Sequence, residues 1–266
     1  MWPFSKKTTI AQSGLLAGAT DHHSHILPGV DDGVESMEES LRILATYETA
    51  GVKELWLTPH IMEDIPNTPE KLLTRFAELR AAYTGSITLH LAAEYMIDNH
   101  LRNLLSEVAD RPGERVQETT SCHFEPKGEI STTKEKLLPI GTKHNHLLVE
   151  TSYYNPPMRL HETLRQIKSL GYHPLLAHPE RYMYMDKEEY KELHEEGVKF
   201  QLNLPSICGA YGNTVKKRAL WLLKEELYDA IGSDTHCEEG VEYLVGSRHK
   251  DKNLRTLQAL LSQTPR

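Results

Sequence analysis

Apolar residues along this chain follow two alternating patterns. Met37, Leu41 and Leu44 recur at the spacing of a helix that ends before Gly51, and the run over 52–57 has the composition of a buried strand. Further along, Thr68 and Pro69 are residue types that begin a helix. Such pairs recur, and we expect strands near 20–26, 52–57, 87–91, 146–150, 174–178, 199–204 and 228–234, with helices near 37–50, 68–84, 99–108, 158–170, 187–196, 214–226 and 254–261.

Seven strand–helix units joined by short connections predict an α/β fold with a parallel sheet. At 266 residues, closure of that sheet into a barrel is the natural arrangement for one large domain. The pattern alone does not distinguish a closed barrel from an open, doubly wound sheet.

Two segments depart from this alternation. Residues 109–144 are polar without sustained periodicity, and a connection of this length inside a compact domain is usually functional or flexible. Within it, 115–122 and 129–133 could pair as a hairpin. Residues 1–19 precede the first chemistry-bearing motif, so we divide the chain into an N-terminal extension over 1–19 and a domain over 20–266.

Charge and cysteine content narrow the classes of function. Against 38 acidic residues the chain has 30 basic ones, a formal charge of -8 without a basic block, which disfavours binding to nucleic acid or to an anionic membrane. Three cysteines without a CxxC pair suit a reducing compartment, and we expect the cytoplasm. The sequence has no run of about 18 apolar residues, so no helix is expected to span a bilayer.

Chemically reactive side chains gather where the expected strands end. In a βα barrel the carboxyl ends of the strands converge on one mouth, so residues distant in sequence become neighbours. His23 and His25, two apart on a strand, point to the same side and can face one ion. The candidate side chains at these ends are His23, His25, His60, Glu94, Glu150, His178, Asp234 and His236.

This donor set indicates bound cations, because crowded carboxylates repel one another unless cations lie among them. Imidazoles and carboxylates without a thiolate favour manganese, iron(II), zinc or magnesium, and the sequence does not choose among them. Other catalytic machinery is missing. The positions where a cysteine-dependent phosphatase needs its arginine hold Gly128, Thr214 and Tyr243, and the glycine-rich nucleotide motifs do not occur.

These motifs, in this order, resemble the polymerase and histidinol phosphatase (PHP) superfamily, and within it the bacterial capsular-polysaccharide tyrosine phosphatases. The resemblance extends over about residues 20–237. The stretches that carry it are His23–Gly33, Thr58–His60, Ala93–Asp98, Leu148–Glu150, His178–Tyr182 and Gly232–His236.

The resemblance implies a distorted (β/α)7 TIM-like barrel, the PHP fold, with three divalent metal ions, manganese first among the candidates. It adds Asp32, which by itself could be a turn residue, and it makes Arg181 the residue that binds the substrate phosphate. An ion pair of Arg181 with Glu180 or another nearby carboxylate is the competing interpretation. The implied ligands are His23, His25, Asp32, His60, Glu94, Glu150, His178, Asp234 and His236.

The resulting hypothesis is a metal-dependent protein-tyrosine phosphatase in which a metal-bridging hydroxide attacks phosphorus without a phospho-enzyme. By resemblance, its substrate is the phosphorylated tail of a membrane tyrosine kinase of capsular or exopolysaccharide biosynthesis. A small-molecule phosphatase of the histidinol phosphatase type and a non-catalytic metal-binding regulatory module stay open, as does a homo-oligomer. The sequence departs from the family in one place: an arginine often follows the final D-x-H, and here Arg248 is only a distant substitute.

Overall fold

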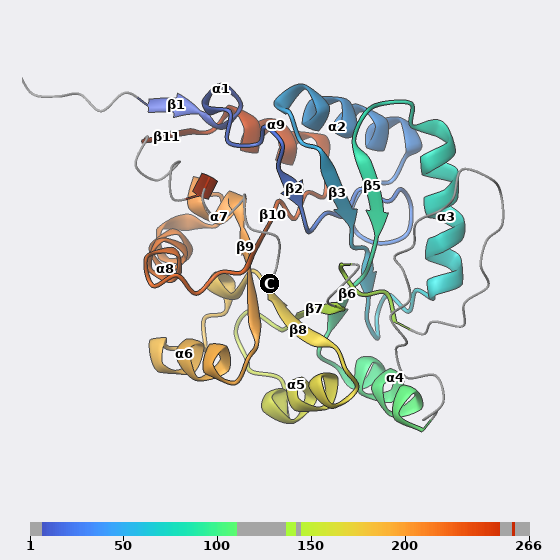
Figure 1. The fold of residues 1–266 in the computed structure, drawn as a ribbon, viewed down its shortest axis with the longest axis vertical. Coiled ribbons are helices and arrows are strands. Elements are labelled where there is room, and N and C mark those ends of the chain that lie inside the picture. Colours follow the sequence, from blue (N-terminus) through green and yellow to red (C-terminus); the bar gives the residue numbers. More distant parts are fainter. Residues whose placement is uncertain (1–6, 111–136, 142–144, 251–256, 259–266) are drawn as a thin grey trace, which may run out of the picture.

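The computed structural model describes residues 7–110, 137–141, 145–250 and 257–258. Most strands lie in the middle of the molecule, with helices around them (Figure 1). The strands are β1 (Lys7–Thr9), β2 (Thr20–Asp21), β3 (Glu54–Leu57), β4 (His60–Ile61), β5 (Thr88–Leu91), β6 (Glu94–Met96), β7 (His146–Glu150), β8 (His173–Ala177), β9 (Lys199–Asn203), β10 (Ala230–Gly232) and β11 (Arg248–Lys250). The helices are α1 (Ile10–Ser13), α2 (Met37–Ala50), α3 (Pro69–Ala82), α4 (Asn99–Ala109), α5 (Leu160–Ser169), the 3₁₀ turn η1 (Pro179–Arg181), α6 (Lys187–Glu195), α7 (Leu204–Cys208), α8 (Gly212–Lys224) and α9 (Glu238–Gly246).

Parallel pairing arranges the strands as a ring. β2, β3 and β5 form one sheet, and a second sheet has the spatial order β10, β9, β8, β7, β6, β4. The two sheets are continuous in the chain, because β3 leads through Thr58 and Pro59 into β4, and β5 leads through Ala92 and Ala93 into β6. Each of these pairs corresponds to one expected strand. The first interruption falls at Pro59, which has no backbone N–H to donate to a ladder.

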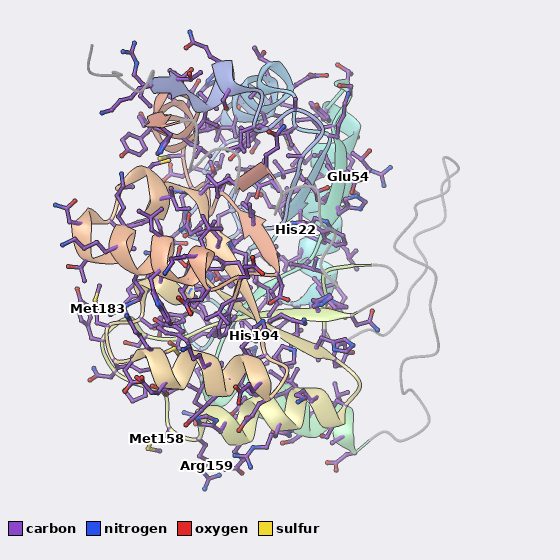
Figure 2. All side chains as sticks on the ribbon, turned by 60° about the vertical axis from the view of Figure 1, so that its left-hand side comes forward. His22, Glu54, Met158, Arg159, Met183 and His194 are labelled. Atoms are coloured by element: carbon purple, nitrogen blue, oxygen red, sulfur yellow. The ribbon has the colours of Figure 1, made fainter. Side chains whose placement is uncertain are left out.

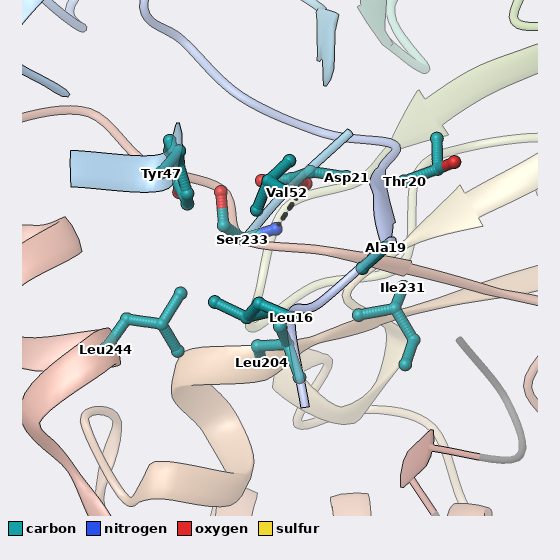
Figure 3. Close-up of a pocket in the computed structure, with 10 residues that line it drawn as sticks. All are labelled: Leu16, Ala19, Thr20, Asp21, Tyr47, Val52, Leu204, Ile231, Ser233 and Leu244. Atoms are coloured by element: carbon teal, nitrogen blue, oxygen red, sulfur yellow. Dashed lines mark hydrogen bonds between the residues drawn. The ribbon is translucent and has the colours of Figure 1, made fainter. Parts of the chain in front are cut away.

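The ring closes between its first and last strands. The N–H of Asp234 donates to the carbonyl of His23 at 2.8 Å, and the N–H of His25 donates to that of Thr235 at 2.9 Å. Asp21 adds a side-chain link, because its Oδ1 accepts the N–H of Ser233 at 2.9 Å beside a small cavity (Figure 3). The chain therefore forms the expected distorted barrel, and the open sheet is excluded.

Alternation along the strands decides which side chains face the barrel interior. Leu148 on β7 pairs in register with Leu175 on β8, and both belong to a small cluster with Trp56 and Ala230. Because residues two apart share a face of a strand, Glu150 lies on the same face as Leu148, nearer the carboxyl end. The residues on the opposite face of β7, Leu147 and Val149, belong to the larger core cluster. An apolar interior layer thus lies beneath the polar mouth.

Six expected helices are confirmed as α2, α3, α4, α5, α6 and α8, with ends that differ by a few residues. Four of them begin at side-chain caps; for example, Ser36 Oγ accepts the N–H of Glu39, and Asp98 Oδ1 accepts that of Leu101. None of the helices in the described part of the chain has the length and apolar character needed to cross a membrane. The helix expected over 254–261, apart from 257–258, and the hairpin expected within 115–133 lie outside the described residues.

Residues 7–19 pack against the rest of the chain, at a place where the sequence predicted no regular structure. β1 pairs antiparallel with β11, more than two hundred residues later. Ile10, Leu15 and Leu16 are buried members of the large core cluster. Neither short strand has a sustained hydrophobic period, so only their pairing shows that they are strands. The sequence likewise missed α7 and α9, which are short helices.

Burial of Ile10 predicts a stability effect from this N-terminal segment. Ile10 is 1% exposed, and Ile10→Ala should lower the free energy of unfolding by about 2–4 kcal/mol, because a buried side chain is truncated and leaves a cavity. Denaturant unfolding followed by tryptophan fluorescence measures this change. The exposed neighbour Gln12→Ala is the matched control, and equal stabilities of the two variants would contradict the prediction.

Candidate metal centre at the barrel mouth

The structure brings all nine predicted ligand residues together at the carboxyl ends of the strands. Eight lie on or directly after β2, β4, β6, β7, β8 and β10, and Asp32 lies on the loop between β2 and α2. Most of these side chains are buried, and Asp32 is the most open, with 65% of its side chain exposed. The nine residues are His23, His25, Asp32, His60, Glu94, Glu150, His178, Asp234 and His236.

One buried carboxylate stands at the centre of this set. Glu94 Oε2 lies 3.3 Å from His23 Nε2, 3.3 Å from His25 Nε2 and 3.2 Å from His60 Nδ1. Its other oxygen, Oε1, lies 3.2 Å from His178 Nε2. Four imidazoles therefore surround one carboxyl group: two from the segment after β2, one from β4 and one from the residue after β8. Both of its oxygens are buried and make no regular hydrogen bond with the described residues.

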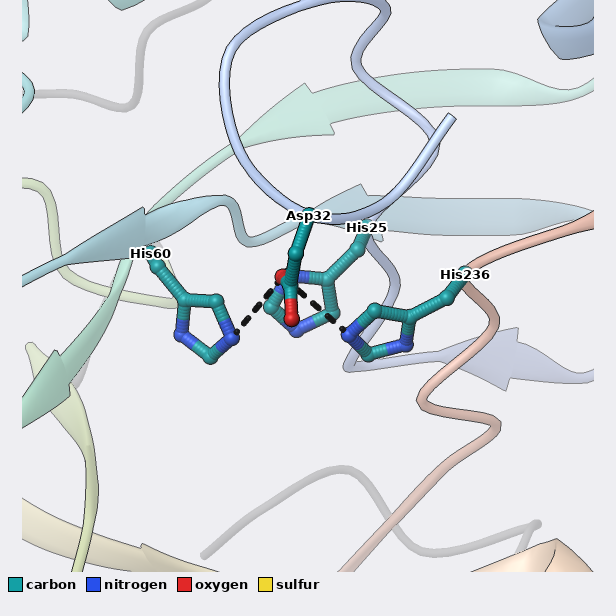
Figure 4. Close-up of side chains that lie close together, drawn as sticks. All are labelled: His25, Asp32, His60 and His236. Carbon is teal, nitrogen blue, oxygen red and sulfur yellow. Dashed lines mark ion pairs between the residues drawn. The ribbon is translucent and has the colours of Figure 1, made fainter. Parts of the chain in front are cut away.

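A second group lies on the more open side of the mouth. Asp32 Oδ1 lies 3.5 Å from His60 Nε2 and 3.7 Å from His236 Nε2 (Figure 4). The ring of His25 stacks on that of His236, with centroids 4.1 Å apart. His236 Nδ1 lies 2.9 Å from the carbonyl oxygen of Asp234 and donates to it, which leaves Nε2 with its lone pair facing Asp32. A metal ion could be held by His25, Asp32, His60 and His236.

Two further carboxylates, those of Glu150 and Asp234, complete the cluster. Glu150 Oε1 lies 3.3 Å from His60 Nδ1, and these two with Glu94 form a further group that could hold an ion. Asp234 Oδ1 lies 3.4 Å from His23 Nε2. The two histidines that begin and end the cluster, His23 and His236, thus both approach the same aspartate.

Two residues that sequence analysis did not assign to the site fix the imidazoles. His25 Nδ1 donates to Asp31 Oδ2 at 2.8 Å, and His23 Nδ1 donates to Gln201 Oε1 at 2.8 Å. Both rings consequently turn Nε2 toward the cluster, where the two nitrogens lie 3.0 Å apart. Orienting partners of this kind are usual behind metal-binding histidines. Asp31 could have been suspected from its place in the Asp31–Asp32 pair, whereas nothing in the sequence singles out Gln201.

Backbone geometry at two strand ends aims site residues inward. His178 and Asp234 have positive φ angles, 34° and 53°, which residues with a Cβ rarely adopt. Each directly ends a strand region, so the turn redirects the side chain toward the mouth. Close packing constrains the loop after β2 as well, because a Cβ on Gly33 would lie 2.1 Å from the carbonyl oxygen of His25. Strained residues of this kind concentrate at functional sites.

Burial and neighbouring charges shift the pKa values of two residues of the cluster. Burial opposes a charge on His25, but its contacts with Asp31 and Glu94 outweigh that effect and raise the pKa of His25 well above its usual value. For Glu150, burial followed by the negative charges of Glu94 and Asp234 raises the pKa of the carboxyl group. A cation among these residues would replace the proton on His25 and allow Glu150 to ionise.

The donor set fits divalent cations. With both Nδ1 atoms donating, the Nε2 atoms of His23 and His25 face each other across 3.0 Å, and a cation bound by both nitrogens would replace the proton that they otherwise share. Glu94 offers two unbonded oxygens that could bridge neighbouring ions. The nine residues supply imidazole nitrogens and carboxylate oxygens, which manganese, iron, zinc and magnesium accept.

Arg181 projects into the mouth from the last residue of η1, the turn that directly follows His178. Its NH1 donates to Asp234 Oδ2 at 2.8 Å, and 16% of its side chain is exposed. The guanidinium carbon lies 4.3 Å and 4.2 Å from the ring centroids of Tyr153 and Tyr211. Only one of its five donors is needed for the ion pair, so donors remain for a ligand at the mouth.

The structure contains an ion pair of the kind that the competing interpretation of Arg181 describes. The arginine does pair with a carboxylate, but that carboxylate belongs to Asp234 and not to Glu180. Glu180 is fully buried, and it accepts hydrogen bonds from the Asn203 N–H at 3.0 Å and the Tyr228 hydroxyl at 2.9 Å. Arg248, the distant substitute, lies exposed on β11, which pairs with β1.

Histidines outside the cluster have other surroundings. His22 is buried within the barrel, whereas the side chain of His194 on α6 is partly exposed. Met158 and Met183 point outward elsewhere on the surface (Figure 2). Burial lowers the pKa of His22 to about 4, and its Nδ1 lies 3.2 Å from the carbonyl oxygen of Ile231. This contact joins the first and last strands of the barrel, a structural role.

Fold and site together define the class: a TIM-like barrel of PHP type whose mouth can hold metal ions. The chain belongs to the CpsB/CapC family. That family, described as "Capsular polysaccharide synthesis, CpsB/CapC", matches residues 19–135 and 128–242.

Individual relatives agree with this membership. The chain is 28% identical over 228 residues to the tyrosine-protein phosphatase CpsB of Streptococcus pneumoniae, covering 81% of this chain and 82% of that protein. It is 24% identical over 238 residues to the putative tyrosine-protein phosphatase CapC of Staphylococcus aureus, covering 88% and 84%. A solved structure described as YwqE from Bacillus subtilis and CpsB, metal-dependent tyrosine phosphatases, superposes with a TM-score of 0.67 at 18% identity, covering 93% of this chain and 97% of that one.

Orientation of His25 by Asp31 predicts a loss of metal affinity in Asp31→Asn. An amide is a weaker acceptor than a carboxylate and does not fix the ring as firmly, so affinity for manganese should fall about 10–100-fold. Titration of the metal-free protein with manganese measures this change. Glu35→Gln removes an exposed acid from the same loop and should bind as the unchanged protein does. An unchanged affinity of Asp31→Asn would show that Asp31 does not orient a ligand.

Proposed function

We propose that this protein is a metal-dependent protein-tyrosine phosphatase whose centre holds three divalent ions, with manganese the first candidate. The observation that carries the proposal is the buried Glu94 carboxylate, with four imidazole nitrogens at 3.2–3.3 Å and an arginine beside the same cluster. Family membership supports the reaction, because the relatives compared above are named as tyrosine-protein phosphatases.

Three overlapping groups of residues would hold the ions. His23 and His25 with Glu94 would form one, and Glu94 with His60 and Glu150 a second. The third would use Asp32 and His236 with His25 and His60, while His178 and Asp234 would complete the shell. Divalent ions of this kind lower the pKa of water toward about 7 and stabilise the attacking and leaving oxygens of a phosphoryl transfer.

Arg181 would bind the phosphoryl group of the substrate. Its guanidinium carries donors in a planar fork that matches phosphate oxygens, and these contacts strengthen as negative charge develops. Asp234 would orient the arginine through Oδ2 while facing the ions through Oδ1. Phosphate would pass directly to water, and the tyrosine phenolate needs less protonation on departure than an alkoxide. A site without an assigned general acid is therefore suited to aryl phosphates.

The proposed substrate is a phosphotyrosine protein, the tail of a membrane tyrosine kinase of capsular or exopolysaccharide biosynthesis. Support comes from the family description, which connects these proteins with capsular polysaccharide synthesis. A cytoplasmic location belongs to the same proposal. Cys208 and Cys237 are free thiols, in keeping with a reducing compartment.

Phosphate release tests the proposed function directly. The protein should hydrolyse a phosphotyrosine peptide in preference to histidinol phosphate when manganese is present, and a chelator should abolish the reaction because the ions are removed. Preference for histidinol phosphate would keep the metal centre but replace the substrate class. Failure to hydrolyse either compound, with manganese bound in stoichiometric amount, would support a regulatory metal-binding module instead.

Two substitutions separate metal binding from phosphate binding. Glu94→Gln keeps the shape of the side chain but removes its charge, so both bound manganese and turnover should fall. Arg181→Ala should lower kcat/KM by about 100- to 1000-fold, because a donor to the developing charge is lost, while bound manganese is retained. Elemental analysis and steady-state kinetics measure the two effects. The exposed Arg248→Ala is the control; loss of manganese from Arg181→Ala would show that its role was misassigned.

A further inference from the structure

Two tyrosines hold the guanidinium group of Arg181 over their ring faces. Tyr153 lies on the connection after β7, and Tyr211 lies at the start of α8. The guanidinium carbon is 4.3 Å from the centroid of the Tyr153 ring and 4.2 Å from that of the Tyr211 ring. At these distances a planar cation is attracted by the negative face of an aromatic ring. We call Tyr153 and Tyr211 the tyrosine clamp.

The ion pair with Asp234 would not by itself fix the orientation of Arg181. The structure records one short contact, from NH1 to a single oxygen of Asp234 at 2.8 Å. A single contact leaves the guanidinium plane free to rotate about the long side chain, and an arginine has much rotamer entropy to lose. Contacts with two ring faces restrict this plane. The tyrosine clamp therefore supplies the constraint that the ion pair lacks.

Both tyrosines are tied to the residues around the metal cluster. The hydroxyl of Tyr211 accepts a hydrogen bond from Asn203 Nδ2 at 3.4 Å, and the same amide donates to Asp234 Oδ2 at 2.8 Å. On the other side, the ring of Tyr153 meets that of His178 edge to face, with centroids 5.9 Å apart. The clamp thus connects the arginine to two predicted ligands.

The backbone joins the clamp to the turn that carries Arg181. The N–H of Met183, two residues beyond that arginine, donates to the carbonyl of Tyr153 at 2.6 Å. The Tyr153 ring also stacks on Tyr182 at 6.4 Å between centroids. Tyr153 and Arg181 are therefore held in a fixed relation by main-chain as well as side-chain contacts.

We propose that Tyr153 and Tyr211 are positioning residues that keep the Arg181 guanidinium oriented toward the phosphoryl group of the substrate. The inference deepens the proposed function and rests on it. The rings do the positioning through their faces. The only hydroxyl contact described above, from Asn203 to Tyr211, is long at 3.4 Å and adds little, so the aromatic rings are needed and the hydroxyl groups are not. The clamp acts only through Arg181 and makes no contribution in its absence.

This role predicts different effects for two substitutions at the same position. Tyr153→Phe and Tyr211→Phe keep the ring and should retain kcat/KM within about twofold. Tyr153→Leu and Tyr211→Leu remove the ring face, and each should lower kcat/KM about tenfold because the arginine is less well oriented. Bound manganese should stay unchanged in all four variants. Tyr243→Leu, on the exposed face of α9, is the control for loss of a surface tyrosine.

Combination with Arg181→Ala distinguishes positioning from a general structural effect. In the Arg181→Ala background, Tyr211→Leu should cause no further loss, since residues that act through one another are not additive. Steady-state kinetics on a phosphotyrosine peptide provide the comparison. Full additivity of the two substitutions, or Leu variants as active as the unchanged protein, would overturn the clamp while leaving the phosphatase function intact.

Binding of inorganic phosphate gives a readout that needs no turnover. Calorimetric titration of the manganese-loaded protein should show about tenfold weaker phosphate binding in the Leu variants, and unchanged binding in the Phe variants. If the unchanged protein hydrolyses no phosphotyrosine, the proposed function fails, yet this titration still decides the clamp. Equal phosphate affinities of the unchanged protein and the Leu variants would then overturn it.

Discussion

Charge balance around the Glu94 carboxylate is the constraint on which the rest of the structure depends. Burying a carboxylate is costly unless positive charge or hydrogen bonds surround it, and here four imidazoles from distant parts of the chain do so. Those imidazoles reach one carboxyl group only because the strands close into a ring. The barrel is therefore the scaffold that brings compensating charges to a small, buried cluster of ionisable groups. An apolar layer around Leu148 and Leu175 lies beneath this cluster.

Residues around the cluster fix the orientation of its imidazoles. Asp31 and Gln201 accept from the outer nitrogens of His25 and His23, so the inner nitrogens keep their lone pairs for the mouth. Asp31 also accepts the backbone N–H of His60 at 3.0 Å, which fixes a third member of the cluster. A single side chain in the loop after β2 consequently holds the ring of His25 and the backbone of His60.

Much of the fold and the composition of the cluster could be predicted from the sequence, for definite physical reasons. The buried run 146–150 and the capped helix after Ser36 carry strong local signals, and reactive side chains at successive strand ends must meet when parallel strands close. What could not be predicted depends on contacts across the chain. Gln201 looks like any polar strand residue until its interior position is known, and the pairing of β1 with β11 joins two segments that have no periodicity of their own.

Asp234 divides its two oxygens between two tasks. Oδ1 faces the imidazoles of the cluster, and Oδ2 accepts from Arg181 and from Asn203. A carboxylate that moves to meet a cation on one side changes the anchor of the arginine on the other. Under the proposed function, ion binding and phosphate binding would therefore be thermodynamically linked through this one side chain, and each would alter the affinity for the other by the same factor. Such reciprocity would make the ion content of the protein a direct determinant of how strongly it retains its product.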